Sequence, residues 1–142
     1  MKLSKKTEYG LRFLLSLAEL SEERYMGIYQ ISLRHNIPMK FLEAIAVTLK
    51  KSGMLEVKKG AGGGYRLRVL PNEISLLMVY EALEGGYKKE LPIKDSDSNN
   101  QKAVYSVVNQ VINDMAEALG RKTLADIQKE FRDMNESLMY YI

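Results

Sequence analysis

The chain has 142 residues, 46% apolar and 27% charged, which are proportions typical of one globular domain or a small domain with an appended element. It has no apolar run near the roughly 18–20 residues of a membrane span, no cysteine and no apolar signal-peptide core, so we expect a cytoplasmic protein of bacterial type without disulfides or thiolate metal sites. The net charge of +3 divides unevenly: residues 1–70 have 13 Lys and Arg against 6 Asp and Glu (+7), and residues 71–142 have 8 against 12 (−4). The basic half indicates either a polyanionic partner or a solvated basic surface.

The N-terminal segment predicts a helix over about residues 5–20, with Ser4 as its N-cap. Its predicted buried face consists of Leu11, Leu14, Leu15 and Ala18. A cluster of polar residues occupies or precedes the first turns: Lys2, Lys5, Lys6 and Tyr9. Cations at this end oppose the helix dipole, so intrahelical stability does not explain them. Contact with phosphates would explain them, and a solvated N-terminus is the alternative.

Two further helices are separated by a tight turn. The first covers about Ile28 to Asn36, and its apolar members are Ile28, Ile31 and Leu33. Asn36-Ile37-Pro38 forms the turn, and His35 beside it is more typical of a turn or surface residue than of a metal ligand. The second helix follows Pro38, ends before Gly53, and has its apolar face formed by Phe41, Leu42, Ile45 and Leu49. This spacing predicts a helix-turn-helix.

Two short strands are predicted next, over Leu55–Lys58 and Tyr65–Val69, joined by the turn Gly60-Ala-Gly-Gly-Gly64. A phosphate-binding loop would require Lys-Ser/Thr and a helix after the glycines, and Tyr-Arg-Leu-Arg follows instead. The helix and hairpin together indicate a recognition helix and the wing of a winged helix-turn-helix. A small glycine tip can approach a DNA backbone or enter a minor groove, assisted by the cations Lys58, Lys59, Arg66 and Arg68.

The second half predicts one helix from Ser75 to Gly85-Gly86, with an inner face of Leu76, Val79, Tyr80 and Leu83. The polar residues 87–100 are predicted to form a flexible linker. A long helix follows over about residues 101–119 and closes at Gly120, with an apolar seam of Val104, Val108, Val111, Met115 and Ala118. Thr123 and Asp126 begin a last helix to about Arg132, and residues 134–142 form a tail.

The predicted fold class is mainly α with a small two-stranded β wing, and three parts are expected. Residues 1–86 form the winged helix-turn-helix domain, 87–100 the linker, and 101–142 the dimerisation helix, short helix and tail. One apolar face of the long helix can pack on the chain's own first helix, which leaves the other for a second copy. A two-fold dimer would place two recognition helices about one DNA turn, roughly 34 Å, apart and match a palindromic operator.

Three segments carry a family resemblance: residues 1–20 (MKLSKKTEYGLRFLLSLAEL), 37–67 (IPMKFLEAIAVTLKKSGMLEVKKGAGGGYRL) and 72–85 (NEISLLMVYEALEG). They resemble the Rrf-two family of bacterial winged helix-turn-helix transcription regulators, the IscR, NsrR and CymR type. The resemblance covers residues 1–86 by motif and the remaining helices by layout. It implies a homodimer in which the long penultimate helix crosses its mate.

The resemblance also implies DNA contacts at Lys5, Lys6 and Tyr9, at the start of the recognition helix (Met39, Lys40, Glu43), and in the wing (Lys59, Gly60, Tyr65). From the charge pattern, the predicted contacts also include Lys50, Lys58 and Arg66. Ala44 stands where many relatives have a polar residue, so base readout from that position is lost. Glu43 could accept a hydrogen bond from a cytosine amino group or simply stabilise the helix.

Cluster-binding members of that family place three cysteines in the segment that corresponds to residues 87–100, and this chain has none there. An iron–sulfur cluster would lack its ligands, which favours the CymR-like branch without a cluster, and we expect no cofactor and no metal. The C-terminal Tyr140, Tyr141 and Ile142 resemble the tails with which serine acetyltransferases enter cysteine synthase. The terminal carboxylate and Ile142 could bind such a partner, or the tail could pack on the dimer.

The sequence bears on three classes of function: a DNA-binding regulator, a protein-binding module and an enzyme. A DNA-binding regulator, acting as a repressor, accounts for the basic half, the recognition helix and the wing. A winged-helix module that binds protein, including a cysteine-synthase-like partner, would not need the basic half. Catalysis has no support, because the chain has no cysteine, one isolated histidine and no recognisable Ser–His or paired-carboxylate arrangement.

Overall fold

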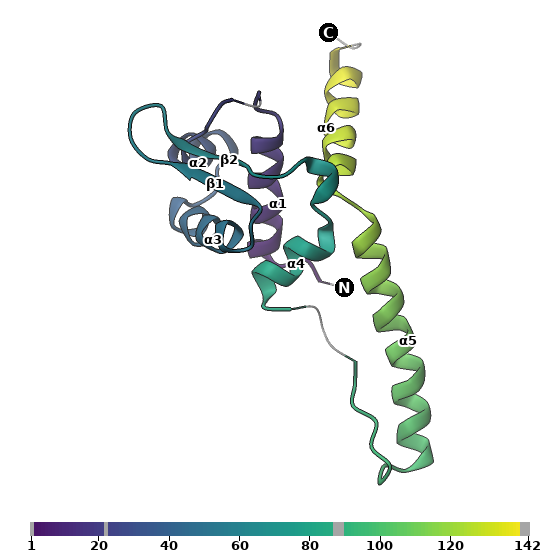
Figure 1. Ribbon diagram of the computed structural model, residues 1–142. Coiled ribbons are helices and arrows are strands. Elements are labelled where there is room, and N and C mark those ends of the chain that lie inside the picture. Colours follow the sequence, from purple (N-terminus) through teal and green to yellow (C-terminus); the bar gives the residue numbers. More distant parts are fainter. Residues whose placement is uncertain (1, 22, 87–89, 140–142) are drawn as a thin grey trace.

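The computed structural model describes residues 2–21, 23–86 and 90–139 (Figure 1). Its elements are, in chain order, α1 (Lys5–Ala18), α2 (Ile28–His35), α3 (Met39–Lys51), β1 (Leu55–Lys58), β2 (Gly64–Leu67), the 3₁₀ helix η1 (Pro71–Glu73), α4 (Leu76–Glu84), α5 (Asn99–Arg121) and α6 (Leu124–Met139). These elements confirm the predicted fold class, a helical protein with a two-stranded antiparallel wing.

Local sequence signals place most of the helix ends. The side chains of Ser4, Ser75 and Ser98 each accept a hydrogen bond from a backbone N–H of the first turn that follows. The αL residues Asn36 (φ 50°) and Gly85 (φ 77°) end α2 and α4. These short-range contacts explain why most boundaries were predictable from the sequence.

The core is built around α1, which contacts α3, α4, β2 and α6. Phe13 and Leu14 are fully buried, and Leu17 is nearly so. Gly10 allows α4 to approach closely, since a Cβ at this position would lie 2.4 Å from Leu83 Cδ1. The predicted stripe was therefore only partly right: Leu14 is buried, whereas Leu11, Leu15 and Ala18 lie half-buried at the edge of the core.

The wing is joined to the helical body through a third extended segment. β1 and β2 pair with Leu55 opposite Leu67 and Lys58 opposite Gly64. Met26 and Tyr65 exchange two backbone hydrogen bonds, of 2.9 and 2.8 Å. Gly64 makes this approach possible: its φ is +141°, and a Cβ there would lie 2.4 Å from the carbonyl oxygen of Met26.

The C-terminal helices pack on the winged-helix body at two places. α5 packs against α4 and extends beyond the body, whereas α6 packs against α1 and η1 (Figure 1). Two backbone hydrogen bonds fix the junction: Leu76 N–H donates to Lys122 O (2.9 Å) and Leu124 N–H donates to Ile74 O (2.8 Å). The prediction that the long helix packs on the first helix was wrong, because α6 occupies that surface.

Several predicted details need correction. Leu33 is 66% exposed because it lies about 200° around α2 from the buried Ile31, and Phe41 is 48% exposed because it lies about 100° from the buried Leu42. α5 begins two residues earlier than predicted and continues through Gly120. α6 continues to Met139, so residues 134–139 are helical rather than a tail.

The predicted linker is only partly described. Residues 87–89 lie outside the described residues, and residues 90–98 form neither helix nor strand. The side chain of Asn109 on α5 binds the backbone of Leu91 twice: the Leu91 N–H donates to Oδ1 (2.7 Å), and Nδ2 donates to the Leu91 carbonyl (3.0 Å). The loop is therefore attached to α5, and its flexibility and the three-part division remain predictions.

The wing geometry predicts that replacing Gly64 by alanine destabilises the protein much more than replacing Gly62, two residues earlier. Gly64→Ala should lower the free energy of unfolding by about 3 kcal/mol, because it adds backbone strain and a clash with Met26. Gly62→Ala is the matched control: its φ is +73°, but a Cβ would meet nothing within 4 Å, so the loss should be about 1 kcal/mol. Urea unfolding at one protein concentration measures both, and equal losses would contradict the close approach at Gly64.

Candidate nucleic-acid interface

The outer face of α3 is continuous and exposed. It consists of residues three or four apart, opposite the buried Leu42, Ile45 and Leu49: Lys40, Glu43, Ala44, Val47 and Lys50. The predicted contacts Lys40, Glu43 and Lys50 therefore lie together, and Met39 is exposed beside them at the helix start. Such a helix face, which no described residue of the chain covers, is the part of a helix-turn-helix that enters a major groove.

The start of α1 lies beside the start of α3. The rings of Tyr9 and Phe41 meet edge to face, with centroids 5.8 Å apart. The cationic groups of Lys5 and Arg12 each lie 5.9 Å from the centroid of the Tyr9 ring. Tyr9 therefore links the predicted basic group of α1, in which Lys6 is also exposed, to the recognition helix.

Arg12 also fixes the turn that leads into α3. Its Nη2 donates to the carbonyl oxygen of His35 (2.8 Å), and its Nη1 lies 3.7 Å from a carboxylate oxygen of Glu8. His35 Nε2 lies 2.8 Å from the hydroxyl oxygen of Ser16. Burial, followed by the charges of Arg12 and Arg34, lowers the pKa of His35, so a neutral imidazole is favoured at this turn. His35 thus has the turn position that the sequence predicted.

A carboxylate from α4 holds the first turn of α1. Glu84 accepts hydrogen bonds from the hydroxyl of Ser4 and from the hydroxyl of Thr7 (2.6 Å for Thr7). The Ser4 hydrogen bond, and then that of Thr7, lowers the pKa of Glu84. Because Ser4 caps α1, this contact fixes the end of the helix from which Lys5 and Lys6 project.

The wing presents only some of its predicted contacts to solvent. Lys58, Lys59 and Gly60 are exposed at the tip. Tyr65 is half-buried, with its ring 5.9 Å from that of Phe13, so it packs against the core. Arg66 forms an ion pair with Glu56, which raises the pKa of the guanidinium, so this cation is already engaged within the chain.

Three residues at this surface were not predicted. Val47 is 51% exposed in the middle of the α3 face, and its place one turn from Glu43 and Ala44 could have revealed it. Arg12 lies one turn after Tyr9, which is a comparable signal. Tyr25 gives no such signal: its ring lies 4.6 Å from the Arg66 guanidinium and 5.8 Å from Lys58 Nζ only because the chain folds back on itself.

The remaining predicted residues belong to the dimer helix and to the C-terminus. Val104, Val108 and Val111 are exposed along α5, with Met115 half-buried below them. Tyr140, Tyr141 and Ile142 lie outside the described residues. Across residues 2–21, 23–86 and 90–139, no helix is long and apolar enough to cross a membrane.

The fold, the exposed α3 face and the basic wing tip define a winged helix-turn-helix DNA-binding protein. Residues 3–130 match the family model of Rrf2 (Rrf-two), described as an iron-dependent transcriptional regulator. The chain is 31% identical to protein rrf2 of Nitratidesulfovibrio vulgaris over 136 residues, covering 92% of this chain and 89% of that protein. It is 27% identical over 142 residues to the HTH-type transcriptional regulator CymR of Bacillus subtilis, covering both chains fully. The solved structure of that CymR matches with a TM-score of 0.77 at 24% identity, covering 92% of this chain and 98% of the other.

The chain therefore belongs to the Rrf2 family of transcriptional regulators. This confirms the resemblance found in the sequence, and it agrees with the prediction that the protein is a DNA-binding regulator and not an enzyme.

The family description implies iron, and the residues of this chain do not fit it. The chain has no cysteine. Within the described parts of the chain, no three His, Asp or Glu side chains are grouped so that they could hold a metal ion. The segment of residues 90–98 offers carboxylates and hydroxyls, which are not ligands for an iron–sulfur cluster. The described residues therefore give no support for regulation through bound iron.

The Glu84 contact predicts a pH dependence of stability. Because folding lowers the pKa of Glu84, the carboxylate stabilises the fold above its unfolded pKa, and this contribution is lost as the pH falls through the lower folded pKa. Glu84→Gln should therefore have a lower Tm than the wild type at pH 7, and the difference should shrink below about pH 4. Glu81→Gln, an exposed change on the same helix, is the control. A constant difference between Glu84→Gln and the wild type from pH 7 to pH 3 would contradict the assignment.

Proposed function

We propose that the protein acts as a homodimeric repressor on a palindromic operator, without an iron–sulfur cluster. The observation that carries the proposal is the exposed α3 face with the basic start of α1 beside it, where Tyr9 packs on Phe41. The wing tip adds the exposed Lys58 and Lys59. These segments lie in the half of the chain that has a balance of +7. A DNA duplex is the polyanion that this combination of helix and wing fits.

The α3 face suggests how bases would be distinguished. Glu43 could accept a hydrogen bond from a cytosine amino group, and Val47 could pack on a thymine methyl group. Lys40 and Lys50 lie on the same face and would contact phosphates at the groove edges. The wing tip, with Lys59 and Gly60 exposed, would contact the backbone or the minor groove beside the recognition helix.

The apolar surface of α5 supports a dimer. Val104, Val107 and Val111 are each more than half exposed, and Val108 is 39% exposed. The C-terminal end of the same helix is already used within the chain, where Leu119 is buried. A row of exposed valines on a helix that extends beyond the body is unfavourable in water, and a second copy would cover it.

α6 adds a second apolar stripe, part of which lies in residues 134–139, where a tail was predicted. Phe131, Met134 and Leu138 follow one another at helical spacing and are 38–63% exposed. A two-fold pair that covers the α5 valines would present two α3 faces to DNA, which matches a palindrome. Occupancy of the operator alone would then exclude other proteins from it, and for this reason we propose repression.

The division of the chain and the binding of a protein partner both stay predictions. In the proposed dimer, residues 1–86 would bind DNA, 87–100 would form the linker and 101–142 would form the interface between the two copies. Binding of a cysteine-synthase-like partner through Tyr140, Tyr141 and Ile142 concerns residues outside those described, and the alternative remains a tail that packs on the dimer.

Phosphate contact predicts a change in salt dependence. Lys59→Ala or Lys5→Ala should weaken binding to all duplexes similarly and lower the slope of log K against log[salt] by about one, because each variant loses about one released counterion. Lys94→Ala, which removes an exposed lysine in the loop before α5, should leave the slope unchanged. Fluorescence anisotropy with a labelled duplex at several salt concentrations measures the slope. Identical slopes in all variants would count against these contacts.

The dimer proposal predicts a monomer when the α5 seam is charged. Val108→Glu with Val111→Glu would place four carboxylates in the two-fold interface, and light scattering should then show a monomer whose affinity for DNA is reduced by at least tenfold. Ser106→Glu lies about 200° around α5 from Val108 and about 140° from Val111, and this variant should remain dimeric. A doubly substituted protein that stays dimeric would refute the interface.

A further inference from the structure

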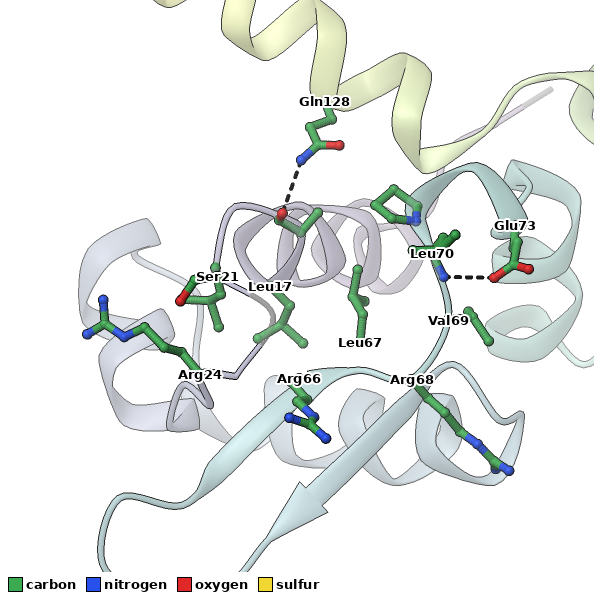
Figure 2. A pocket seen from close by; sticks show the side chains of 13 residues that line it. Leu17, Ser21, Arg24, Arg66, Leu67, Arg68, Val69, Leu70, Glu73 and Gln128 are labelled. Carbon is green, nitrogen blue, oxygen red and sulfur yellow. Dashed lines mark hydrogen bonds between the residues drawn. The ribbon is translucent and has the colours of Figure 1, made fainter.

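The wing has an inner and an outer face. Side chains alternate along a strand, and directly paired residues of two antiparallel strands share a face. Leu55 is buried and pairs with Leu67, so these two residues mark the inner face. Glu56 and Arg66 pair with each other one position along and therefore project from the outer face. Figure 2 shows the alternation on β2: Leu67 points toward α1, whereas Arg66 points the other way.

Tyr25 reaches this outer face from the loop before α2. Met26, the next residue, is buried and exchanges backbone hydrogen bonds with Tyr65 of β2, so the side chain of Tyr25 points outward. The centroid of the Tyr25 ring lies 4.6 Å from the guanidinium carbon of Arg66 and 5.8 Å from Lys58 Nζ. Both distances are within the range of cation–π contacts, which extends to roughly 6 Å. Tyr25 therefore lies against two cations of the wing.

Glu56 lies on the same strand and the same face as Lys58. Residues two apart on a strand are separated by about 6.6 Å, a distance that a lysine side chain can span to reach a carboxylate. Instead, Glu56 accepts a hydrogen bond from Arg66 Nε. In the described part of the chain, no carboxylate lies within ion-pair distance of Lys58. Arg66 thus occupies a carboxylate that would otherwise compete with DNA for this lysine.

We propose that Arg66 and Tyr25 are positioning residues that keep Lys58 available to a DNA phosphate. Arg66 engages Glu56, and the face of the Tyr25 ring attracts both cations and so favours this arrangement. The inference rests on the proposed DNA-binding function. It assigns Arg66 a role other than the direct contact expected from its charge, because Arg66 acts through Glu56 without touching DNA.

The first test compares the salt dependence of binding to a labelled duplex. Lys58→Gln should reduce the slope of log K against log[salt] by about one, because one phosphate contact is lost. Arg66→Gln should reduce it by the same amount, because the released Glu56 then pairs with Lys58. The double variant should also lose about one, since both changes remove the same contact. A loss of about two would show that Arg66 contacts phosphate directly and would overturn the proposal.

A second substitution tests whether Arg66 acts through Glu56. Glu56→Gln, added to Arg66→Gln, should restore the wild-type slope, because a neutral amide does not hold the Lys58 ammonium. Glu81→Gln, added to Arg66→Gln, removes an equal charge on the exposed side of α4 and should restore nothing. Glu56, Lys58 and Arg66 are exposed or half-buried, so the variants should fold, and circular dichroism checks this. A slope that Glu56→Gln leaves reduced, or that both additions restore equally, would overturn the proposal.

A matched pair of variants tests the aromatic ring of Tyr25. Tyr25→Phe keeps the ring and should bind the duplex as tightly as the wild type. Tyr25→Leu keeps an apolar side chain without the ring and should bind about threefold more weakly. Ring-current shifts of the Arg66 side-chain protons, measured by NMR, should persist in Tyr25→Phe and disappear in Tyr25→Leu. Equal affinities of the two variants for the duplex would overturn the role of the ring.

A measurement without DNA distinguishes failure of this inference from failure of the proposed function. Lysine ammonium protons exchange with water more slowly when a carboxylate holds them, and NMR measures this exchange. The Lys58 ammonium should exchange more slowly in Arg66→Gln than in the wild type, and adding Glu56→Gln should reverse the change. Unchanged exchange in Arg66→Gln would overturn the inference even if the duplex binds. If no duplex binds, the proposed function fails, while the exchange rates still decide whether Arg66 keeps Lys58 from Glu56.

Discussion

Burial of α1 is the constraint on which the rest of the structure depends. This one helix contacts α3, α4, the wing and α6, and the fully buried Phe13 and Leu14 lie at its centre. Full burial of such side chains is worth roughly 1.5–3 kcal/mol each relative to exposure in water. Gly10 brings α4 close on one side, and Tyr65 packs against Phe13 on another. The recognition helix, the wing and α6 are therefore positioned by their packing on the same helix.

The same helix connects the parts of the candidate DNA surface. Glu84 fixes its first turn through Ser4 and Thr7, and Tyr9 packs on Phe41 at the start of α3. One turn later, Arg12 binds the carbonyl of His35 and so holds the turn that leads into α3. Segments from residues 4 to 84 thus set the position of the recognition helix relative to the basic start of α1. Preorganisation of this kind reduces the entropy lost when a rigid surface binds DNA.

At its other end, α1 meets the helices that extend beyond the body. Gln128 of α6 binds Ala18, the last residue of α1, and Arg132 pairs with Glu19, the residue after it. The chain has no cysteine, so the loop before α5 offers no thiolate. α1 therefore joins the candidate DNA surface at one end to the C-terminal helices at the other.

Local signals made the helices and the wing predictable. Ser4, Ser75 and Gly85 cap or end helices through contacts within a few residues, and the glycine turn between two short β-rich runs indicates a hairpin. The basic front half and the spacing of Leu42, Ile45 and Leu49 were equally visible in the sequence. Family membership, established by comparison, agrees with these signals.

Other features depended on which segments meet in space. Phe41 was predicted to be buried, but it packs at the edge of the fold against Tyr9, because one position along a helix is a rotation of about 100°. The bridge to Met26 sets the orientation of the wing, so the ring of Tyr65 packs against Phe13, and its contact with DNA stays a prediction.

The sequence by itself determined the helix-turn-helix, the wing and the charge division, because capping, periodicity and turn chemistry act over a few residues. Only the tertiary structure decided that α6 rather than α5 packs on α1, that Arg66 is engaged by Glu56, and that Tyr25 lies against this arginine. The packing of α6 on α1 depends on contacts between residues up to 113 positions apart, which no local pattern encodes.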